Sequence, residues 1–270
     1  MDNNDLLRQL ISERDERNKY REMQEQKHKK FMKTLGINID GVIRSLYEQF
    51  DKVYRKTYIH NPNLIAMNED FTVRDYSEEE VDDFEDKSRL RELEMINLPL
   101  TSPNLTNHYK FENVKDMIGD KFLTPKEACD QFMYEKYTFQ IFADAEEYEN
   151  ACEIINKIQI FGLKNNLFNV VLLSTVKSPA IPSTYYFLSK NHSRARNIMF
   201  LEEDYLKWGF CDVLIDCVPE ALQSVPEDKK IIKINQPFNQ WDKAEYSFDS
   251  LSKMYGDKEF FDGEFVKMFE

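Results

Sequence analysis

The sequence predicts an α/β fold, a doubly wound parallel sheet with a helical cap insertion and an N-terminal helical arm. The first observation behind this prediction is a series of short apolar runs that alternate with segments of helical periodicity, as in βαβ units. The second is that several of these runs end in polar residues, and ligands bind at that end of parallel strands. Hydrophobic residues make up 41% of the 270 residues, which is enough for a sizeable core.

The predicted arm, residues 1–30, is one long and highly charged helix. Only its start carries a short apolar stripe, and the remainder is mostly Arg, Glu, Gln and Lys, so the helix can bury little of itself. A solitary polar helix is marginally stable in water. We therefore expect it either to stay solvated or to pack against a protein partner, which includes other copies of this chain in a homo-oligomer.

Residues 31–58 predict a strand, a turn and a helix, which form the first part of the core. An apolar run ends in Asn38 and Asp40, and Gly41 follows as the turn. Apolar residues at helical spacing then extend from Ser45 to Tyr58. This unit places polar side chains at the carboxyl end of a buried strand.

Residues 59–140 are the predicted helical cap insertion. Pro62 ends the preceding pattern, and the region that follows shows no clear strand alternation. Pro99, Pro103 and Pro125 divide it into short pieces. Helices joined by loops, placed between the two halves of the sheet, are the expected structure.

The second part of the core is predicted over residues 141–241. Its short apolar runs, bounded by polar and turn residues, are typical of buried parallel strands. Four such strands are expected: Asn169 to Thr175, Ile198 to Leu201, Asp212 to Asp216 and Ile231 to Ile234.

Helices are expected between and after these strands. One spans Ala145 to Ile160, with Gly162 as its C-terminal cap. The helix after the first of the four strands is expected to turn Tyr185, Tyr186 and Leu188 inward. The C-terminal tail, residues 242–270, predicts one or two helices rich in Phe.

Charge and composition narrow the classes of function. The chain has 36 basic and 49 acidic residues, a net charge of −13, which argues against sequence-independent binding of DNA or RNA. No basic segment followed by an apolar core opens the sequence, and no run approaches the ~18 apolar residues of a membrane span. A cytoplasmic protein without membrane contact is expected. The four Cys show no CxxC spacing and the four His no metal-ligand spacing, so free thiols and no zinc site are expected.

Three predicted strands end in polar groups that can carry chemistry. They are Asn38 with Asp40, Ser174 with Thr175, and Asp216. Because the carboxyl ends of parallel strands share one edge of a sheet, we expect these side chains to converge. Each also has a purely structural interpretation, since Asp40 can bond the turn after its strand and the others can cap helices or turns.

The arrangement resembles the haloacid dehalogenase (HAD) superfamily, and within it the 5′(3′)-deoxyribonucleotidases. The resemblance rests on the segments Gly36 to Arg44, Asp212 to Glu220 and Ile234 to Asn239. It implies that the Asn38 position holds the nucleophile and Asp40 the general acid and base. It further implies a phosphate site at Ser174, Thr175 and Lys177, and a magnesium site at Asp216 and Asp40.

Two departures from the family pattern concern the reaction. Asn38 stands where the family has its nucleophilic aspartate, and an amide oxygen is a poor nucleophile. Cys217 stands where many relatives have a second acid, and a thiol is a poor ligand for Mg²⁺. The cation of the third family motif stays open among Lys177, Arg194, Arg196 and Lys207.

Three hypotheses about function follow. The leading one is a catalytically degenerate HAD-like protein that serves as a structural or assembly component, without a cofactor. Its composition, rich in Asn, Lys, Ile, Phe and Tyr and low in Gly, suits an AT-rich genome. The resemblance to short nucleotidase-like HAD proteins of bacteriophages implies, by analogy, a place in a virion or tail complex. The alternative is a magnesium-dependent nucleotidase acting on deoxynucleoside monophosphates. A third is a module that binds nucleotide or phosphate without cleaving it.

Overall fold

A computed structural model describes residues 32–58, 66–67, 73–74, 105–107, 109 and 123–270. The predicted arm and most of the predicted cap lie outside these residues, so both stay predictions. No helix in the described ranges has both the length and the apolar character needed to cross a membrane.

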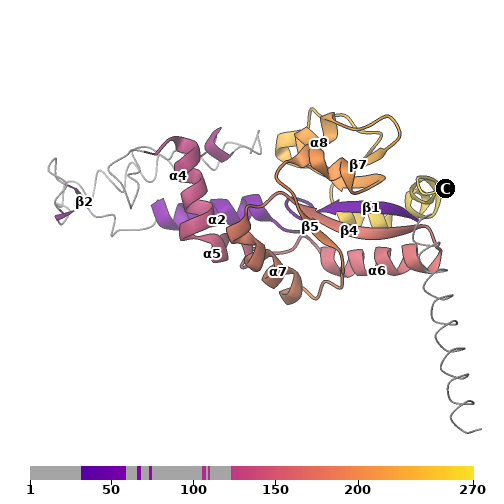
Figure 1. Ribbon diagram of the computed structural model, residues 1–270, viewed down its shortest axis with the longest axis horizontal. Coiled ribbons are helices and arrows are strands. Elements are labelled where there is room, and N and C mark those ends of the chain that lie inside the picture. Colours follow the sequence, from indigo (N-terminus) through magenta and orange to yellow (C-terminus); the bar gives the residue numbers. More distant parts are fainter. Residues whose placement is uncertain (1–31, 59–65, 68–72, 75–104, 108, 110–122) are drawn as a thin grey trace, which may run out of the picture.

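The core is a six-stranded sheet in the order β5-β4-β1-β6-β7-β8, with every neighbouring pair parallel (Figure 1). The prediction of a doubly wound α/β fold is confirmed. The first strand of the sequence lies near the middle of the sheet, so both of its neighbours come from much later in the chain. The strands are β1 (Lys33–Asn38), β4 (Phe168–Ser174), β5 (Ile198–Phe200), β6 (Val213–Asp216), β7 (Lys230–Ile234) and β8 (Tyr246–Phe248).

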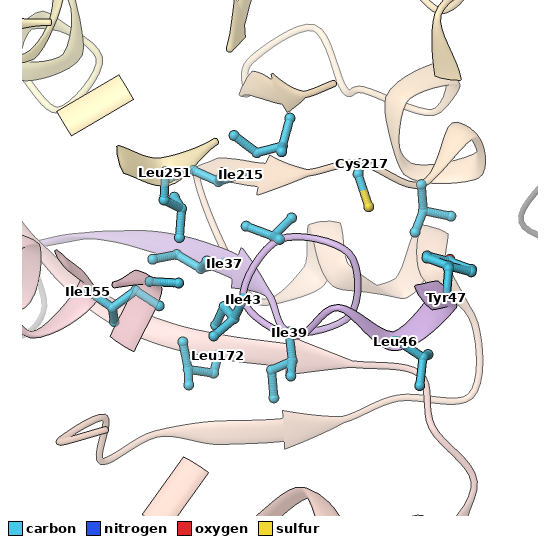
Figure 2. Close-up of a cluster of buried hydrophobic side chains, with 14 of the residues drawn as sticks. Ile37, Ile39, Ile43, Leu46, Tyr47, Ile155, Leu172, Ile215, Cys217 and Leu251 are labelled. Atoms are coloured by element: carbon cyan, nitrogen blue, oxygen red, sulfur yellow. The ribbon is translucent and has the colours of Figure 1, made fainter. Parts of the chain in front are cut away.

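Alternating residues of β4, β6 and β7 contribute to two hydrophobic clusters on opposite faces of the sheet. Val170 and Leu172 belong to the larger cluster, whereas Val171 and Leu173 belong to the smaller one. Figure 2 shows part of the larger cluster, where Ile39, Ile43 and Leu172 lie close together. The flanking helices are α2 (Leu46–Tyr58), α5 (Thr138–Phe142), α6 (Ala151–Lys164), α7 (Ile181–Lys190), α8 (Pro219–Gln223) and α9 (Leu251–Gly256).

Shorter elements complete the described chain. α4 (Pro125–Gln131) begins with a capping box in which Thr124 and Glu127 satisfy each other's backbone N–H groups. η2 (Phe132–Lys136) continues it as a π-helical turn. The remaining elements are the paired β2 (Ala66–Met67) and β3 (Val73–Arg74), η1 (Leu105–Asn107), η3 (Ser178–Ala180), η4 (Asp204–Gly209), η5 (Pro237–Asn239) and η6 (Phe260–Phe265).

Gly162 is not the predicted helix cap. It lies inside α6, and a Cβ there would come within 2.7 Å of the Phe168 carbonyl oxygen. The glycine therefore lets the helix approach β4 closely, and the helix ends at Lys164 with Asn165 as its cap. The helix also begins later than predicted, at Ala151.

Two further expectations are wrong. Tyr185 and Tyr186 of α7 are 50% and 51% exposed, because the inward face of the helix is formed by Ser183, Thr184, Phe187 and Leu188. The tail contains a strand as well as helices, since β8 pairs in parallel with β7. A strand of three residues is too short for its alternation to stand out in a sequence.

Gly41→Ala is expected to lower the free energy of unfolding by about 2–4 kcal/mol. Gly41 has a φ of +81°, and a Cβ there would lie 2.5 Å from the Cys217 sulfur. Urea denaturation measures the effect, with Gly209→Ala as the matched control because nothing lies within 4 Å of its added Cβ. Equal stabilities of the two variants would contradict this account of the turn.

Candidate functional site

The carboxyl end of the sheet opens into a cavity of about 420 Å³. Asn38, Asp40 and Thr175 line it from the strand ends, and Asp130 and Tyr134 line it from α4 and η2. The structure thus brings the first two polar strand ends together. Other lining residues are Leu46, Tyr47, Leu105, Thr106, Lys126, Cys129, Met133, Val176, Asp204, Val218 and Glu220.

Both carboxylate oxygens of Asp40 are engaged inside the protein. Oδ1 accepts hydrogen bonds from Nε and Nη2 of Arg44, at 2.8 and 2.6 Å. Oδ2 accepts a hydrogen bond from the Ser174 hydroxyl at 2.9 Å. Charge-assisted bonds of this kind are among the strongest in proteins. Asp40 is thus a structural partner of Arg44 and Ser174 before any ligand arrives.

The Arg44 side chain is completely buried. Besides Asp40, its Nη1 donates to the carbonyl of Phe142 at 2.9 Å and to the hydroxyl of Thr184 at 3.0 Å. Its guanidinium carbon lies 5.1 Å from the ring centroid of Phe142 and 5.3 Å from that of Phe187. A buried charge is tolerated only with such partners, so the pair is fixed in place.

Asn38 also bonds within the site. Its Nδ2 donates to the backbone carbonyl of Asp40 at 2.7 Å, and the Cys217 thiol approaches the same oxygen at 3.5 Å. The amide therefore does what a carboxylate cannot do, since a carboxylate has no hydrogen to donate. The two departures in the sequence, Asn38 and Cys217, thus meet at one carbonyl.

Asp216 is paired just as fully. Its Oδ2 accepts from the amine of Lys207 at 2.7 Å, and its Oδ1 accepts from the backbone N–H groups of Cys217 and Val218. Lys207 is completely buried and also contacts Asp204 at 2.5 Å. Burial lowers the pKa of Lys207, but the two carboxylates outweigh burial and raise it above its ordinary value. The amine thus stays charged between its two acids.

The four basic residues that the sequence offers for the third family motif lie in different places and have different partners. Lys207 is the one that reaches a strand end, through Asp216. Lys177 pairs instead with Asp130 at 2.6 Å, on the exposed side of the cavity wall. Arg194 and Arg196 are exposed, in the loop before β5. Thr175 donates to Asp204 at 3.4 Å, which ties the second strand end to the same network.

These side chains do not fit a magnesium site. Mg²⁺ needs carboxylate oxygens with free lone pairs in an octahedral arrangement. In the described chain Asp40 and Asp216 point their oxygens at Arg44, Ser174 and Lys207, and no group of three or more His, Cys, Asp or Glu could hold a metal. We therefore derive no step through a metal.

Among the known proteins compared with this chain, only solved structures are similar to it. No family model and no curated protein matches. Among solved structures the chain is similar to CbbY from Rhodobacter sphaeroides in complex with phosphate, with 10% identity, 83% of this chain and 96% of that one covered, and a TM-score of 0.46. It is also similar to a haloacid dehalogenase-like hydrolase from Streptococcus pneumoniae, with 9% identity, 84% and 98% covered, and a TM-score of 0.45.

A third similar structure is YfnB from Bacillus subtilis, a HAD-hydrolase bound to magnesium, with 11% identity, 83% and 97% covered, and a TM-score of 0.44. Neither family nor reaction follows from likeness at this level. What the site can do therefore follows from its own side chains.

Sequence reasoning missed the partners that decide the site. Arg44 was visible as part of the motif, and its position four residues after Asp40 is a spacing at which opposite charges pair. Asp204 lies three residues before Lys207, which is also a pairing spacing, but that spacing does not show that Asp216 shares the same amine. Thr184 carried no such signal, because its contact depends on how α7 packs. Periodicity does not report contacts between distant elements.

Lys207→Met is expected to cost about 3–5 kcal/mol, because it leaves the buried Asp216 without its counter-charge. Burial raises the pKa of Asp216, so without Lys207 the folded state takes up a proton more readily than the unfolded state. The loss should therefore shrink as the pH falls from about 7 to about 4, which urea denaturation at both values measures.

The matched control is the double variant Lys207→Met, Asp216→Asn, which removes the charge and keeps the size of the Asp216 side chain. Its stability should exceed that of the single variant and should depend less on acid. A single variant as stable as the parent would contradict the role assigned to this pair.

Proposed function

We propose that this chain works by binding and not by phosphoryl transfer, as a structural or assembly component built on a HAD-like fold. One observation carries the proposal: Asn38 occupies the nucleophile position while both oxygens of Asp40 are held by Arg44 and Ser174. The motif segments point to the family, and the contacts within them point away from its reaction.

The nucleophile, the general acid and base, and the phosphate-binding hydroxyl of phosphoryl transfer are each absent or already bonded within the chain. The Asn38 amide is neutral, so it cannot attack phosphorus as a carboxylate does. Three of the about four lone-pair positions of the Asp40 carboxylate already accept hydrogen bonds from Arg44 and Ser174, which leaves little room for a substrate proton. The Ser174 hydroxyl is completely buried and directed at Asp40, which takes it away from a phosphate.

Three acids that line the cavity, Asp40, Asp130 and Asp204, and the neighbouring Asp216 are paired with cations, whereas Glu220 is not paired within the described residues. Arg44 offsets Asp40, Lys177 offsets Asp130, and Lys207 lies between Asp204 and Asp216. Enzymes keep such groups poised and partly unsatisfied, so that they meet charge that develops in the transition state. Here the hydrogen bonds are already made, which favours a rigid scaffold.

The finer assignment, to a bacteriophage virion or tail complex, remains part of this proposal and rests on composition and on analogy with short nucleotidase-like proteins of bacteriophages. Partner capture from an infected host, with the full chain as bait, would address it. The coarser role as an assembly component does not depend on that source.

A second candidate is a module that binds a small ligand without cleaving it. The observation that favours it is the cavity, whose ~420 Å³ falls within the usual range of ligand sites. Lys126 and Glu220 both line it, and neither forms an ion pair within the described chain. A ligand with both an acidic and a basic group would match them.

Asn38→Asp is expected to stay inactive, because a new carboxylate meets an Asp40 that Arg44 still holds. Phosphate release with Mg²⁺ and a panel of deoxynucleoside monophosphates measures this for the parent, for Asn38→Asp and for Asp40→Ala. All three should match the blank without protein. A thermal-shift series with the same nucleotides, without turnover, tests the second candidate in parallel.

Two outcomes would count against the proposal. Release by the parent that is lost in Asp40→Ala would show an enzyme, the magnesium-dependent nucleotidase of the alternative hypothesis. Release gained by Asn38→Asp would show that only the nucleophile is missing and that Arg44 does not close the site. Stabilisation by a nucleotide without release would support the second candidate.

A further inference from the structure

We infer that the open edge of the sheet at β5 pairs with β5 of a second copy of this chain, antiparallel and around a twofold axis. β5 is a terminal strand, and within the described residues no other strand pairs with its free side. An unpaired strand edge is a template for another strand. This inference does not depend on whether the cavity is catalytic.

The backbone of β5 leaves bonding groups free at this edge. The Asn197 carbonyl accepts from Leu172 N–H, and Leu201 N–H donates to the Ser174 carbonyl, both at 2.9 Å. Because backbone groups alternate in direction along a strand, those of Ile198 and Phe200 point away from β4. With Met199 on the axis, Ile198 of one copy faces Phe200 of the other and their free groups can bond.

In this arrangement, the basic residues before β5 in one copy face the acidic residues after β5 in the other copy. Arg194 and Arg196 are exposed before the strand, and Glu202 and Glu203 are exposed after it. Among the described residues none of these four side chains has an ion-pair partner. Antiparallel pairing centred on Met199 sets Arg196 opposite Glu202 twice. Opposite charges at facing positions favour pairing, and like charges oppose it.

The opposite edge of the sheet, at β8, lacks this complementary pattern of charges. β8 is flanked by Glu245 and Asp249, so antiparallel pairing centred on Ser247 would set two acids opposite each other. That pattern discourages a second copy. With a net charge of −13 per chain, two copies repel unless opposite charges meet locally. β5 is therefore the edge at which this chain can meet itself.

Apolar surface beside β5 extends the contact. Tyr185 of α7 packs against Phe200 with ring centroids 5.6 Å apart, and Tyr186 packs against Phe139 of α5 at 5.2 Å. Phe139 and both tyrosines remain about half exposed, and Met199 is 36% exposed. Strand pairing around the axis would bring the two copies of α7 together and cover this surface. Burial in this dimer contact would explain why the outer face of α7 carries two tyrosines.

Sedimentation of the full chain over about 1–100 µM tests the inference by mass action. The parent should dimerise, and Arg196→Glu and Glu202→Arg should each weaken the dimer about tenfold, since each sets like charges opposite each other twice. An equimolar mixture of the two variants should dimerise, because every facing pair in the mixed dimer is opposite in charge. The doubly swapped chain should also recover.

Lys164→Glu at the C-terminal end of α6 is the matched control, because Lys164 is exposed and, like Arg196, has no ion-pair partner among the described residues. It makes the same change in net charge as Arg196→Glu, far from the edge in sequence, and should leave the dimer intact. A monomeric parent would overturn the inference and leave this edge to a strand from a different protein. A dimer that neither single substitution weakens would also overturn it, and would place the contact elsewhere.

Discussion

The buried guanidinium of Arg44 is the interaction on which the site depends. It joins the turn after β1 to the carbonyl that ends α5 and to the Thr184 hydroxyl of α7, while Asp40 passes the contact on to Ser174 at the end of β4. Four segments that lie far apart in the sequence are therefore linked through this single ion pair. A buried ion pair adds little net stability over apolar residues of similar shape, but losing one partner is costly. Either member of such a pair is therefore hard to replace alone, even though the pair itself strengthens the fold little.

Under the proposed function, this constraint explains why the two acids of the motif are present without the family's reaction. Asp40 is required by Arg44, and Asp216 is required by Lys207 and by two backbone N–H groups. Neither acid can be exchanged without leaving a buried charge or donor unpaired. Asn38 has a structural role of its own, because its Nδ2 donates to the Asp40 carbonyl and an aspartate could not make that bond. Under the proposed function, all three positions of the motif therefore serve the fold.

The fold was largely predictable, and the site only in outline. Apolar runs such as 169–175 are long and continuous, so their burial as strands follows from composition, and parallel pairing brings their ends together. Gly162 misled because a glycine near a helix end can serve as a cap or as a point of close approach, and only the position of Phe168 decides between them. Tyr185 and Tyr186 misled because aromatic residues were assigned to the core by type. The roles of Arg44 and Lys207 depend on contacts across the fold, which no local pattern encodes.

The two regions of the sheet that face outward differ in how their polar groups are used. At the carboxyl end, carboxylates and hydroxyls are satisfied within the chain, so a ligand must compete with bonds that already exist. At the β5 edge, backbone groups and four charged side chains lack partners within the described chain, so a strand that pairs there replaces bonds to water and breaks none within the chain. A partner gains most where the polar groups of a surface have no partner within the chain and lose little hydration when they are covered. The surface beside β5 therefore fits the role of a contact site better than the cavity does, which agrees with a protein that acts through association.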